Sequence, residues 1–467
     1  MKLTRTPFVS KKVTRVTMHT RALKIASIAA LLAMTLISEA CAESDLRVGA
    51  AAAEFIGDDS MPIAGSILPG KVQGQEGKLR AVAVVLEKPG SGKLAIVACD
   101  LLMITRDLLD PVVQQITATT GIPGERVLIN CTHTHHAPST VRVHGYDRVP
   151  AFCEEVQRKI VQAVKDADAN LSKDGCEFLF HLGREETIGM NSRLMLGDGT
   201  IYWTGERGDV VRPTGPFDPE LPVLAFRDSG QRLKALLFNH STHTIGVRSG
   251  GKRSPSFYGL AAQELEAELG GITSFIEGAS GSTHNFSGAA PVPVAIQRLK
   301  EAVQTALSQA QPRPVDKLAA IKRPFTFKIR HFDEAKEDAA VVAYCEKRMA
   351  PRAASTIEVF RKMRADLAPQ QGQERTTWLQ VARIGDVAVV GIPAEFFTKL
   401  GLDIKNRSPF RHTYIAELAN DWIGYVADQD AFKLGGYQVW TGFHSYCEPG
   451  TGERIVETVI EMLNELR

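Results

Sequence analysis

The chain has 467 residues, of which 44% are hydrophobic and 23% charged. This is ordinary globular composition, and the length allows one large domain or two of average size. The formal net charge is only +2, and no basic tract follows the N-terminal segment. The sequence therefore gives no case for nucleic-acid binding or for an acidic partner.

The N-terminal segment has the pattern of an export signal. Basic residues between Lys2 and Lys24 precede an apolar run at 25–37, which is shorter than the roughly 20 residues of a membrane-spanning helix. Small residues around Cys41 then offer a cleavage site. We expect residues 1–42 to be a signal peptide and residues 43–467 to be exported to the periplasm or secreted. The alternatives are an uncleaved anchor and a lipid-modified Cys41.

Six cysteines follow the predicted cleavage site, and none of them forms a Cys-x-x-Cys pair. A zinc–thiolate site is therefore not expected. Export permits disulfides, but six cysteines in a chain of this size do not make a disulfide-stapled scaffold. Cys99 and Cys131 stand near predicted strand ends, where we expect them to be buried.

Strand and helix patterns alternate along the rest of the chain, after a small and turn-rich stretch at 48–70 that we expect to be a loop. Strands are predicted at 79–100 (a hairpin), 127–129, 176–182, 222–226, 233–238, 273–276, 319–329, 378–392 (a second hairpin) and 412–418. Helices are predicted at 107–119, 150–171, 256–269 and 291–311, as a hairpin at 334–367, and at the C-terminal end. The predicted class is α/β, with mixed sheets and flanking helices.

Histidines gather where the strand at 127–129 ends. His133, His135 and His136 account for three of the twelve histidines within four positions. In an extended strand, side chains two residues apart project on the same face, so His133 and His135 are expected to lie together. Such clustering is typical of metal ligands or of acid–base groups. The alternative interpretation is a polar strand end with solvated histidines.

Other strand ends carry similar chemistry. His240 follows the strand at 233–238, Glu395 follows the hairpin at 378–392, and Tyr425 and Tyr437 follow glycines after the strand at 412–418. In layered α/β folds such positions meet in one crevice. A set of histidines and a carboxylate suits a catalytic zinc site better than a structural one. Taken singly, the tyrosines also fit core aromatics, and Glu395 also fits a carboxylate at a helix N-terminus.

The order of these motifs resembles the neutral/alkaline, non-lysosomal ceramidase family, specifically its N-terminal catalytic domain, from about Leu46 onward. The family motif Thr-His-Thr-His-Ser-Gly-Pro stands here as residues 132–138, Thr-His-Thr-His-His-Ala-Pro. The family's Phe-x-x-His-x-Thr strand end, shifted by one residue, matches 238–242, and its Pro-Gly-Glu-Phe motif matches 393–396. The family's C-terminal β-sandwich domain has no counterpart in this sequence, which we expect to be a single ceramidase-like catalytic domain.

The resemblance implies a Zn²⁺ cofactor and roles for particular residues. It assigns the metal ligands His133, His240, Glu395 and Tyr425. It assigns catalytic roles to His135 as the acid–base group, and to Arg193 and Tyr437 as groups that orient the substrate or stabilise an oxyanion. Three further histidines have no matched partner in the family and are expected to lie outside the ligand set: His136, His243 and His284.

One loop departs from the family pattern. Where the family has Gly-Asp-x-Ser-Pro, this chain has Gly281-Ser282-Thr283-His284-Asn285. Ser282 replaces the aspartate and His284 replaces the serine that contacts the sphingoid hydroxyl or has been proposed as nucleophile. We expect Ser282 and His284 to contact the substrate, but recognition of ceramide itself does not follow.

These patterns predict an exported zinc-dependent hydrolase that cleaves an amide (N-acyl) bond of a lipid-like or other small-molecule substrate by metal-activated water. Ester substrates and peripheral membrane association are left open, and no protein partner is predicted. The alternative from another class is a non-catalytic periplasmic binding protein that keeps the fold. A metal-free serine hydrolase that uses Ser282 beside His284 is disfavoured, because the Gly-x-Ser-x-Gly elbow is incomplete.

Overall fold

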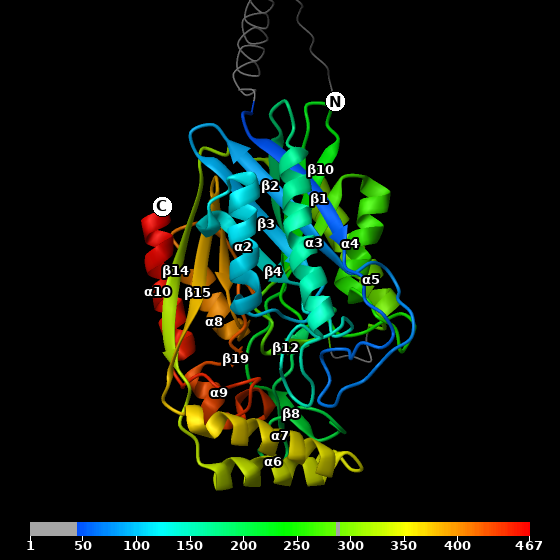
Figure 1. Ribbon diagram of the computed structural model, residues 1–467, viewed down its shortest axis with the longest axis vertical. Coiled ribbons are helices and arrows are strands. Elements are labelled where there is room, and N and C mark those ends of the chain that lie inside the picture. Colours follow the sequence, from blue (N-terminus) through cyan, green and yellow to red (C-terminus); the bar gives the residue numbers. More distant parts are fainter. Residues whose placement is uncertain (1–43, 286–289) are drawn as a thin grey trace, which may run out of the picture. The chain divides into compact units, whose positions relative to one another are not determined.

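The computed structural model describes residues 44–285 and 290–467 of the chain. The predicted signal peptide at 1–42, with Cys41, lies outside the described residues. Within the unit formed by Asp45–Arg467, three main sheets and their flanking helices account for most of the regular structure (Figure 1). This arrangement confirms the predicted α/β class with mixed sheets.

The first sheet has the strand order β1-β2-β3-β4. Its strands are β1 (Arg47–Glu54), β2 (Arg80–Lys88), β3 (Gly92–Cys99) and β4 (Val127–Cys131). Strands β1 to β3 pair antiparallel, whereas β4 pairs with β3 in parallel. Helices α2 (Arg106–Thr120) and α3 (Pro150–Ala169) lie on one face of this sheet (Figure 1). The short helix η1 (Gly124–Arg126) leads into β4.

The second sheet has the order β11-β10-β9-β5-β13. Its strands are β5 (Glu177–Arg184), β9 (Glu220–Arg227), β10 (Leu233–His240), β11 (Ile272–Glu277) and β13 (Gln311–Pro312). Only β10 and β11 are parallel among the pairs of this sheet. Helices α4 (Ser256–Leu269) and α5 (Val292–Gln309) pack against it with a core of their own.

The third sheet has the order β14-β15-β16-β18. Its strands are β14 (Leu318–Lys328), β15 (Glu374–Ile384), β16 (Val387–Ile392) and β18 (His412–Glu417). Again one pair, β16 and β18, is parallel. Helices α8 (Thr398–Arg407) and α10 (Thr451–Leu466) pack beside it, and the chain between β14 and β15 forms the helical hairpin α6 (Glu334–Arg348) and α7 (Ala353–Leu367), followed by η2 (Ala368–Gln370).

Short two-stranded ribbons carry the loops that follow the main strands. They pair β6 (Met190–Asn191) with β12 (Thr283–His284), β7 (Leu194–Leu196) with β8 (Val210–Pro213), and β17 (Glu395–Phe396) with β19 (Tyr425–Val426). Helix α9 (Gln429–Leu434) and the turn η3 (Tyr437–Val439) follow β19. The ribbons β6–β12 and β7–β8 are formed by loops of the second sheet, and β17–β19 by loops that follow strands of the third.

One apolar cluster joins the three sheets. It combines side chains of β2 and β3, of β5, β9 and β10, and of β15, β16 and β18, including Ile96, Phe226 and Val389. Because each sheet buries one face in this common core and the other under helices, its strands are apolar on both faces, as the continuous buried runs of β2, β4 and β16 show. The shared core fixes the three sheets relative to one another.

The predicted elements were found with small shifts in their ends, and one prediction was wrong. The stretch at 48–70 was expected to be a loop, but its first part forms β1. A Cβ atom on Gly49 would lie 1.9 Å from the carbonyl oxygen of Ala167 in α3. The strand is built from small residues because the helix lies against it, and this packing hides the usual β-branched signature of a strand.

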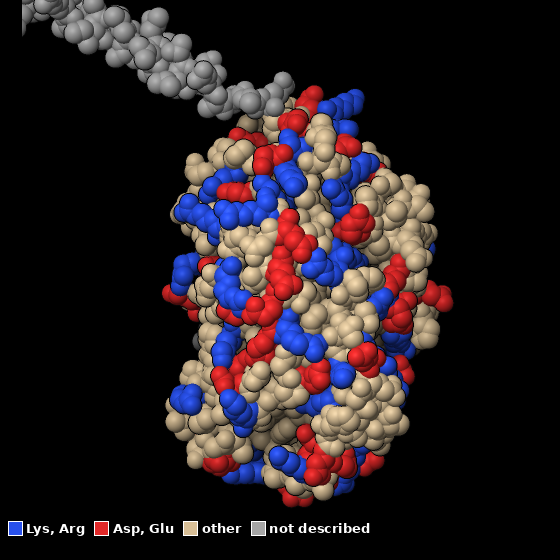
Figure 2. All heavy atoms as spheres, turned by 90° about the vertical axis from the view of Figure 1, so that its left-hand side faces the viewer, with Lys and Arg blue, Asp and Glu red and all other residues tan. Residues whose placement is uncertain are grey.

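Three further properties of the fold concern its helices, its cysteines and its surface charge. Every helix in the described part of the chain is too short or too polar to cross a membrane. The six described cysteines are buried and none is in a disulfide; they include Cys99 and Cys131, whose burial was predicted. Figure 2 shows basic and acidic side chains intermixed over the face that carries α10, without a field of one sign.

Candidate metal centre

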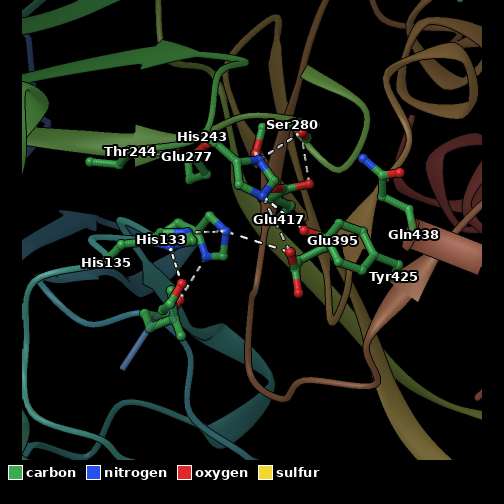
Figure 3. A network of polar contacts seen from close by, with 12 residues as sticks. His133, His135, His243, Thr244, Glu277, Ser280, Glu395, Glu417, Tyr425 and Gln438 are labelled. Carbon is green, nitrogen blue, oxygen red and sulfur yellow. Dashed lines mark hydrogen bonds and ion pairs between the residues drawn. The ribbon is translucent and has the colours of Figure 1, made fainter. Parts of the chain in front are cut away.

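The candidate site lies where the parallel strands of all three sheets end. His133 follows β4, His243 follows β10, and Glu395 follows β16. The carboxyl ends of parallel strands are where α/β proteins commonly place their ligands. Figure 3 shows these side chains pointing toward one another from separate parts of the fold. These side chains therefore meet because the three sheets pack together, and no single sequence motif contains all of them.

Three imidazole rings form the centre of the site. Ligand atoms of His133, His135 and His243 all lie within 4.8 Å of one another. The Nε2 atoms of His133 and His135 are 3.3 Å apart. Two imidazole nitrogens that face each other at this distance need a proton or a cation between them, because two lone pairs repel.

The opposite nitrogen of each ring is held by the backbone. The Nδ1 atoms of His133, His135 and His243 lie 3.0 Å from carbonyl oxygens, those of Leu102, Gly65 and Ser280 respectively. A carbonyl can only accept, so each Nδ1 donates, and each Nε2 keeps its lone pair for the centre. Metal-binding histidines are oriented in this way.

A carboxylate and a phenol lie beside the histidines. An Oε2 atom of Glu395 lies 3.5 Å from Nε2 of His133 and 3.4 Å from Nε2 of His243. The hydroxyl oxygen of Tyr425 lies 3.0 Å from the same nitrogen of His243. The other carboxylate oxygen of Glu395 accepts a hydrogen bond from Nε1 of Trp422 at 3.2 Å. Glu395 therefore offers one free oxygen to the centre.

These spacings suit a metal ion. Four ligands at about 2.0–2.1 Å from a tetrahedral zinc ion lie about 3.3 Å from one another. The separations of 3.3, 3.4 and 3.5 Å among His133, His135, His243 and Glu395 are close to that value. The donor set of imidazoles with one carboxylate is the chemistry that zinc prefers at catalytic sites. The residues present therefore fit such an ion.

Burial sets the charges of these groups. It lowers the pKa of His133 to about 4 and that of His135 well below its usual value, so both rings are neutral at neutral pH. Burial alone would raise the pKa of Glu395, but the adjacent imidazoles of His243 and His133 and the hydroxyl of Tyr425 hold it at about 2. Neutral imidazoles and an ionised carboxylate are the forms that bind a cation.

A pair of buried acids surrounds the loop that carries Ser280. Glu417 accepts hydrogen bonds from the backbone N–H and the hydroxyl of Ser280, at 2.9 and 2.5 Å, and from the N–H of Phe396 at 2.8 Å. Glu277 lies beside it, and burial raises the pKa of both carboxyls. Through these contacts Glu417 joins the carbonyl that orients His243 to the strand that carries Glu395 (Figure 3).

The structure brings together most of the residues that the sequence had singled out, but not His240. Both ring nitrogens of His240 are occupied elsewhere, by the hydroxyl of Tyr258 at 2.5 Å and the carbonyl of Glu185 at 2.9 Å. The chain reaches the centre three residues later, with His243. Matching His240 to the family motif required a shift of one residue. This shift indicated that the alignment at His240 was weak.

The geometry of the His133–His135 pair also differs from the prediction. Strand β4 ends at Cys131, and His133 has a φ of 59°. The two rings therefore do not meet by strand alternation. They meet because the chain turns at His133, in a left-handed conformation that costs a non-glycine residue roughly 1 kcal/mol or more. His136 turns away, and its Nε2 accepts the N–H of Gly246 at 3.0 Å.

Tyr437 and Arg193 lie further from the centre. The hydroxyl of Tyr437 is hydrogen-bonded to Nε2 of His144 at 3.0 Å, and its ring centroid lies 5.8 Å from that of Tyr425. Arg193 is buried and donates to the side chain of Gln438 and to the carbonyls of Ala431 and Gly435. Arg193 thus holds the segment that carries Tyr437, and no contact joins its guanidinium to the histidines.

The altered loop contributes His284, whereas Ser282 is used within the fold. The ring of His284 stacks on that of His243, with centroids 4.1 Å apart. Ser282 exchanges hydrogen bonds with Thr398, at 3.1 and 3.2 Å. Ser282 is buried, and its hydroxyl donates its single proton to Thr398 rather than to His284.

Comparison with solved structures identifies the architecture. No family model and no curated protein matches the sequence. Two solved structures match over 91% of this chain, each with a TM-score of 0.70 and 18% identity. They are neutral ceramidase from Pseudomonas aeruginosa, covered over 75% of its chain, and a structure described as ceramidase complexed with C2, covered over 76%. The chain has the neutral ceramidase fold.

At 18% identity this likeness shows the fold and carries no statement about activity. It agrees with the expected ceramidase-like arrangement of mixed sheets and flanking helices. The chemistry of the site has to be argued from this chain's own residues, and those include His284 and His243 in places that the sequence comparison did not assign.

Proposed function

We propose that the protein is an exported zinc-dependent hydrolase that cleaves a C–N amide bond of an N-acyl, lipid-like substrate. The observation that carries the proposal is the close grouping of the free atoms of His133, His135, His243 and Glu395. The pairs His133–His135, His243–Glu395 and His133–Glu395 are 3.3, 3.4 and 3.5 Å apart, and the three histidine ligand atoms all lie within 4.8 Å of one another. Export is supported by the N-terminal segment at 1–42, and the lipid-like substrate by the fold shared with ceramidases.

In this proposal His133, His135 and His243 hold the ion together with Glu395, and Tyr425 lies beside it. His243 takes the place first assigned to His240. His135 moves from the acid–base role to the ligand set, because its Nε2 faces that of His133. When bound, a zinc ion supplies Lewis acidity and lowers the pKa of water from 15.7 to about 7.

The protein's own residues position the reaction. The hydroxyl of Tyr425 donates its one proton to Glu395 in the absence of substrate, and can donate it to a substrate oxygen as charge develops there. His284 is the remaining imidazole at the centre, and burial keeps it neutral by lowering its pKa well below the usual value. A neutral ring can take a proton from the attacking water and return it to the leaving amine.

The decisive experiment combines metal analysis with a substrate panel. Purified mature protein is expected to contain about one zinc ion per chain, and a His133→Ala variant to lose it. Matched N-acyl amides and esters, with lipid-like and short apolar tails, would then be tested for hydrolysis before and after chelation. Absence of zinc, with equal behaviour of wild type and variant, would contradict the hydrolase.

The second candidate is a periplasmic binding protein that keeps the metal centre. The altered loop Gly281–Asn285 favours it, because His284 stands where ceramidases have a serine. Stoichiometric zinc in a protein that leaves the whole panel intact, but binds one of its members, would support this alternative.

A further inference from the structure

A second cavity lies apart from the metal centre, between α6 and the segment 432–440. Its volume is about 680 Å³, within the range of small-molecule pockets. One wall is a face of α6, with Glu337, Ala340 and Tyr344 at helical spacing. The opposite wall includes Phe432 and Trp440. No ligand of the proposed metal centre lines this cavity.

A buried cation stands at one end of the cavity. Arg330 is only 6% exposed, and its Nη1 and Nη2 atoms donate to the carbonyl of Val439 at 2.7 Å and the hydroxyl of Ser445 at 2.6 Å. Both acceptors are neutral. Its Nε atom is buried and has no hydrogen-bond partner in the described part of the chain. Nη1 and Nη2 carry two N–H donors each, and one donor of each is used in these two bonds, so a second donor on each Nη atom is left for a ligand.

The charge of Arg330 is not neutralised by a contact. Of the ion pairs formed by the described residues, none includes Arg330. Burial lowers the pKa of Arg330 to about 10, so the group stays protonated at neutral pH. The acid that faces it, Glu337, accepts the backbone N–H of Thr441 at 2.9 Å. A buried charge without a paired partner is costly unless a ligand supplies one.

The two ends of the cavity differ. At the far end, Lys347 and Arg348 are balanced by two acids: both contact Asp198, at 2.6 and 3.3 Å, and Arg348 also contacts Asp209 at 2.8 Å. Near Arg330 the lining includes Lys336, which adds a second positive charge to that end. The cavity therefore has one neutralised end and one end with excess positive charge.

The middle of the cavity is apolar and aromatic. Tyr344 and Trp440 are buried and lie edge to face, with ring centroids 5.4 Å apart. Phe432 lies against the guanidinium of Arg330 at 5.0 Å. The small side chains of Ala340 and Ala343 on α6 leave space for a ligand along the cavity. An apolar body would replace water on these surfaces, while its charged head reached Arg330.

We infer that this cavity binds an amphipathic carboxylate, with the carboxylate on the free donors of Arg330 and an apolar chain along Tyr344 and Trp440. The inference does not depend on the metal centre or on the proposed hydrolase. A carboxylate is favoured because it accepts paired hydrogen bonds from a guanidinium and neutralises its charge.

The test uses the full mature protein and decanoate as the probe, with decanol and decyltrimethylammonium as uncharged and cationic comparisons. Calorimetry and the fluorescence of Trp440, which lines the cavity, report binding. Decanoate is expected to bind at least about tenfold more tightly than either comparison. An Arg330→Met variant is expected to lose at least about tenfold in decanoate affinity. Equal binding of all three probes would overturn the inference.

A second pair of variants guards against misfolding of Arg330→Met. Ala343 is exposed on α6 and lines the cavity, whereas Ala335 is exposed on the same helix outside it. Ala343→Leu is expected to weaken decanoate binding severalfold, and Ala335→Leu to leave it unchanged. A His133→Ala variant should bind decanoate like the wild type. Loss of binding in His133→Ala, with full binding in Ala343→Leu, would place the carboxylate at the metal centre and refute the inference.

Discussion

The Nε2 atom of His243 lies 3.0 Å from the hydroxyl oxygen of Tyr425. His243 follows β10 of the second sheet, and Tyr425 begins β19, in the ribbon that follows the third sheet. Their rings are nearly parallel, with an interplanar angle of 4°. His240, at the end of β10, has no contact with Tyr425 because its ring nitrogens face Tyr258 and Glu185. The contact with Tyr425 therefore places His243, and not His240, beside the candidate centre.

Replacing His243 should remove the metal, whereas replacing His240 should not. Zinc analysis of His243→Gln is expected to give protein with little or no metal, because one of the proposed ligands is lost. His240→Gln is the matched variant three residues away, and is expected to retain about one zinc ion per chain. Retention of zinc by His243→Gln and its loss from His240→Gln would restore the original assignment.

Glu417 should control metal affinity without touching the ion. Glu417→Leu removes the acceptor for the N–H groups of Ser280 and Phe396, which position the loops of His243 and Glu395. We expect zinc affinity to fall about 10- to 100-fold, as for other groups that orient metal ligands. Competition with a chelator measures the affinity, and the visible spectrum of the cobalt-substituted protein reports ligand geometry.

The conservative variant provides the control for Glu417. Glu417→Gln keeps a carbonyl oxygen for the backbone N–H groups and can donate to the hydroxyl of Ser280. Its affinity and cobalt spectrum should stay close to those of the wild type. Identical affinity of Glu417→Leu and wild type would show that Glu417 does not position the centre.

Gly65 should be intolerant of a side chain. Its φ is +106°, and a Cβ atom there would lie 2.6 Å from Cβ and Nδ1 of His135. Gly65→Ala is therefore expected to displace the ring of His135 and to cost roughly 1–2 kcal/mol of unfolding free energy. Zinc affinity should fall with it. Gly70→Ala, where a Cβ meets nothing within 4 Å, is the control and should change neither property.

The two tyrosines should separate metal binding from substrate handling. Tyr425→Phe removes a hydroxyl next to His243 and Glu395, and we expect it to lower zinc affinity by about tenfold. Tyr437→Phe removes a hydroxyl that is bonded to His144 instead. It should leave zinc affinity unchanged, and any effect should appear in kcat or KM on a hydrolysed substrate. A loss of zinc from Tyr437→Phe would contradict this division.

The metal-free protein should become less stable in acid because His144 is protonated more readily in the unfolded chain than in the folded one. Burial lowers the pKa of His144 to about 4 from an ordinary value of 6.5. Between these values the unfolded chain binds a proton that the folded chain does not, so stability falls as pH decreases from 6.5 toward 4. The slope contributed is about 1.4 kcal/mol per pH unit. Urea unfolding of His144→Asn across this range should show a slope reduced by this amount, with His331→Asn, at an exposed position, as the control.

Much of the fold could be predicted from periodicity. The hairpins at β2–β3 and β15–β16 have clear turn residues between apolar runs, and α3 has an apolar stripe, so their local signals agreed with the structure. Strand β1 could not be predicted, because its small residues reflect the close approach of α3, which is a tertiary property. Sequence periodicity does not predict a strand whose residues are determined by the close packing of a helix.

The sequence predicted the type of candidate site, but only some of the residues that form it. Apolar strands that end in His or Glu correctly indicated which chain segments would meet, and His133, His135, Glu395 and Tyr425 lie together. The sequence could not place His243, because the path of the chain after β10 depends on its bridge to His284 in a loop forty residues away. Nor could it show that Arg193 faces Gln438.

Each of the three sheets leads into part of the proposed centre: His133 and His135 follow β4, His243 follows β10, and Glu395 follows β16. An ion bound by all three would act as a cross-link between distant parts of the chain, and would be released if any one sheet came apart. Its binding free energy would then oppose the local opening of every sheet at once. Amide hydrogen exchange in strands far from the ion should slow when zinc is added, and the three sheets should become a single cooperative unit.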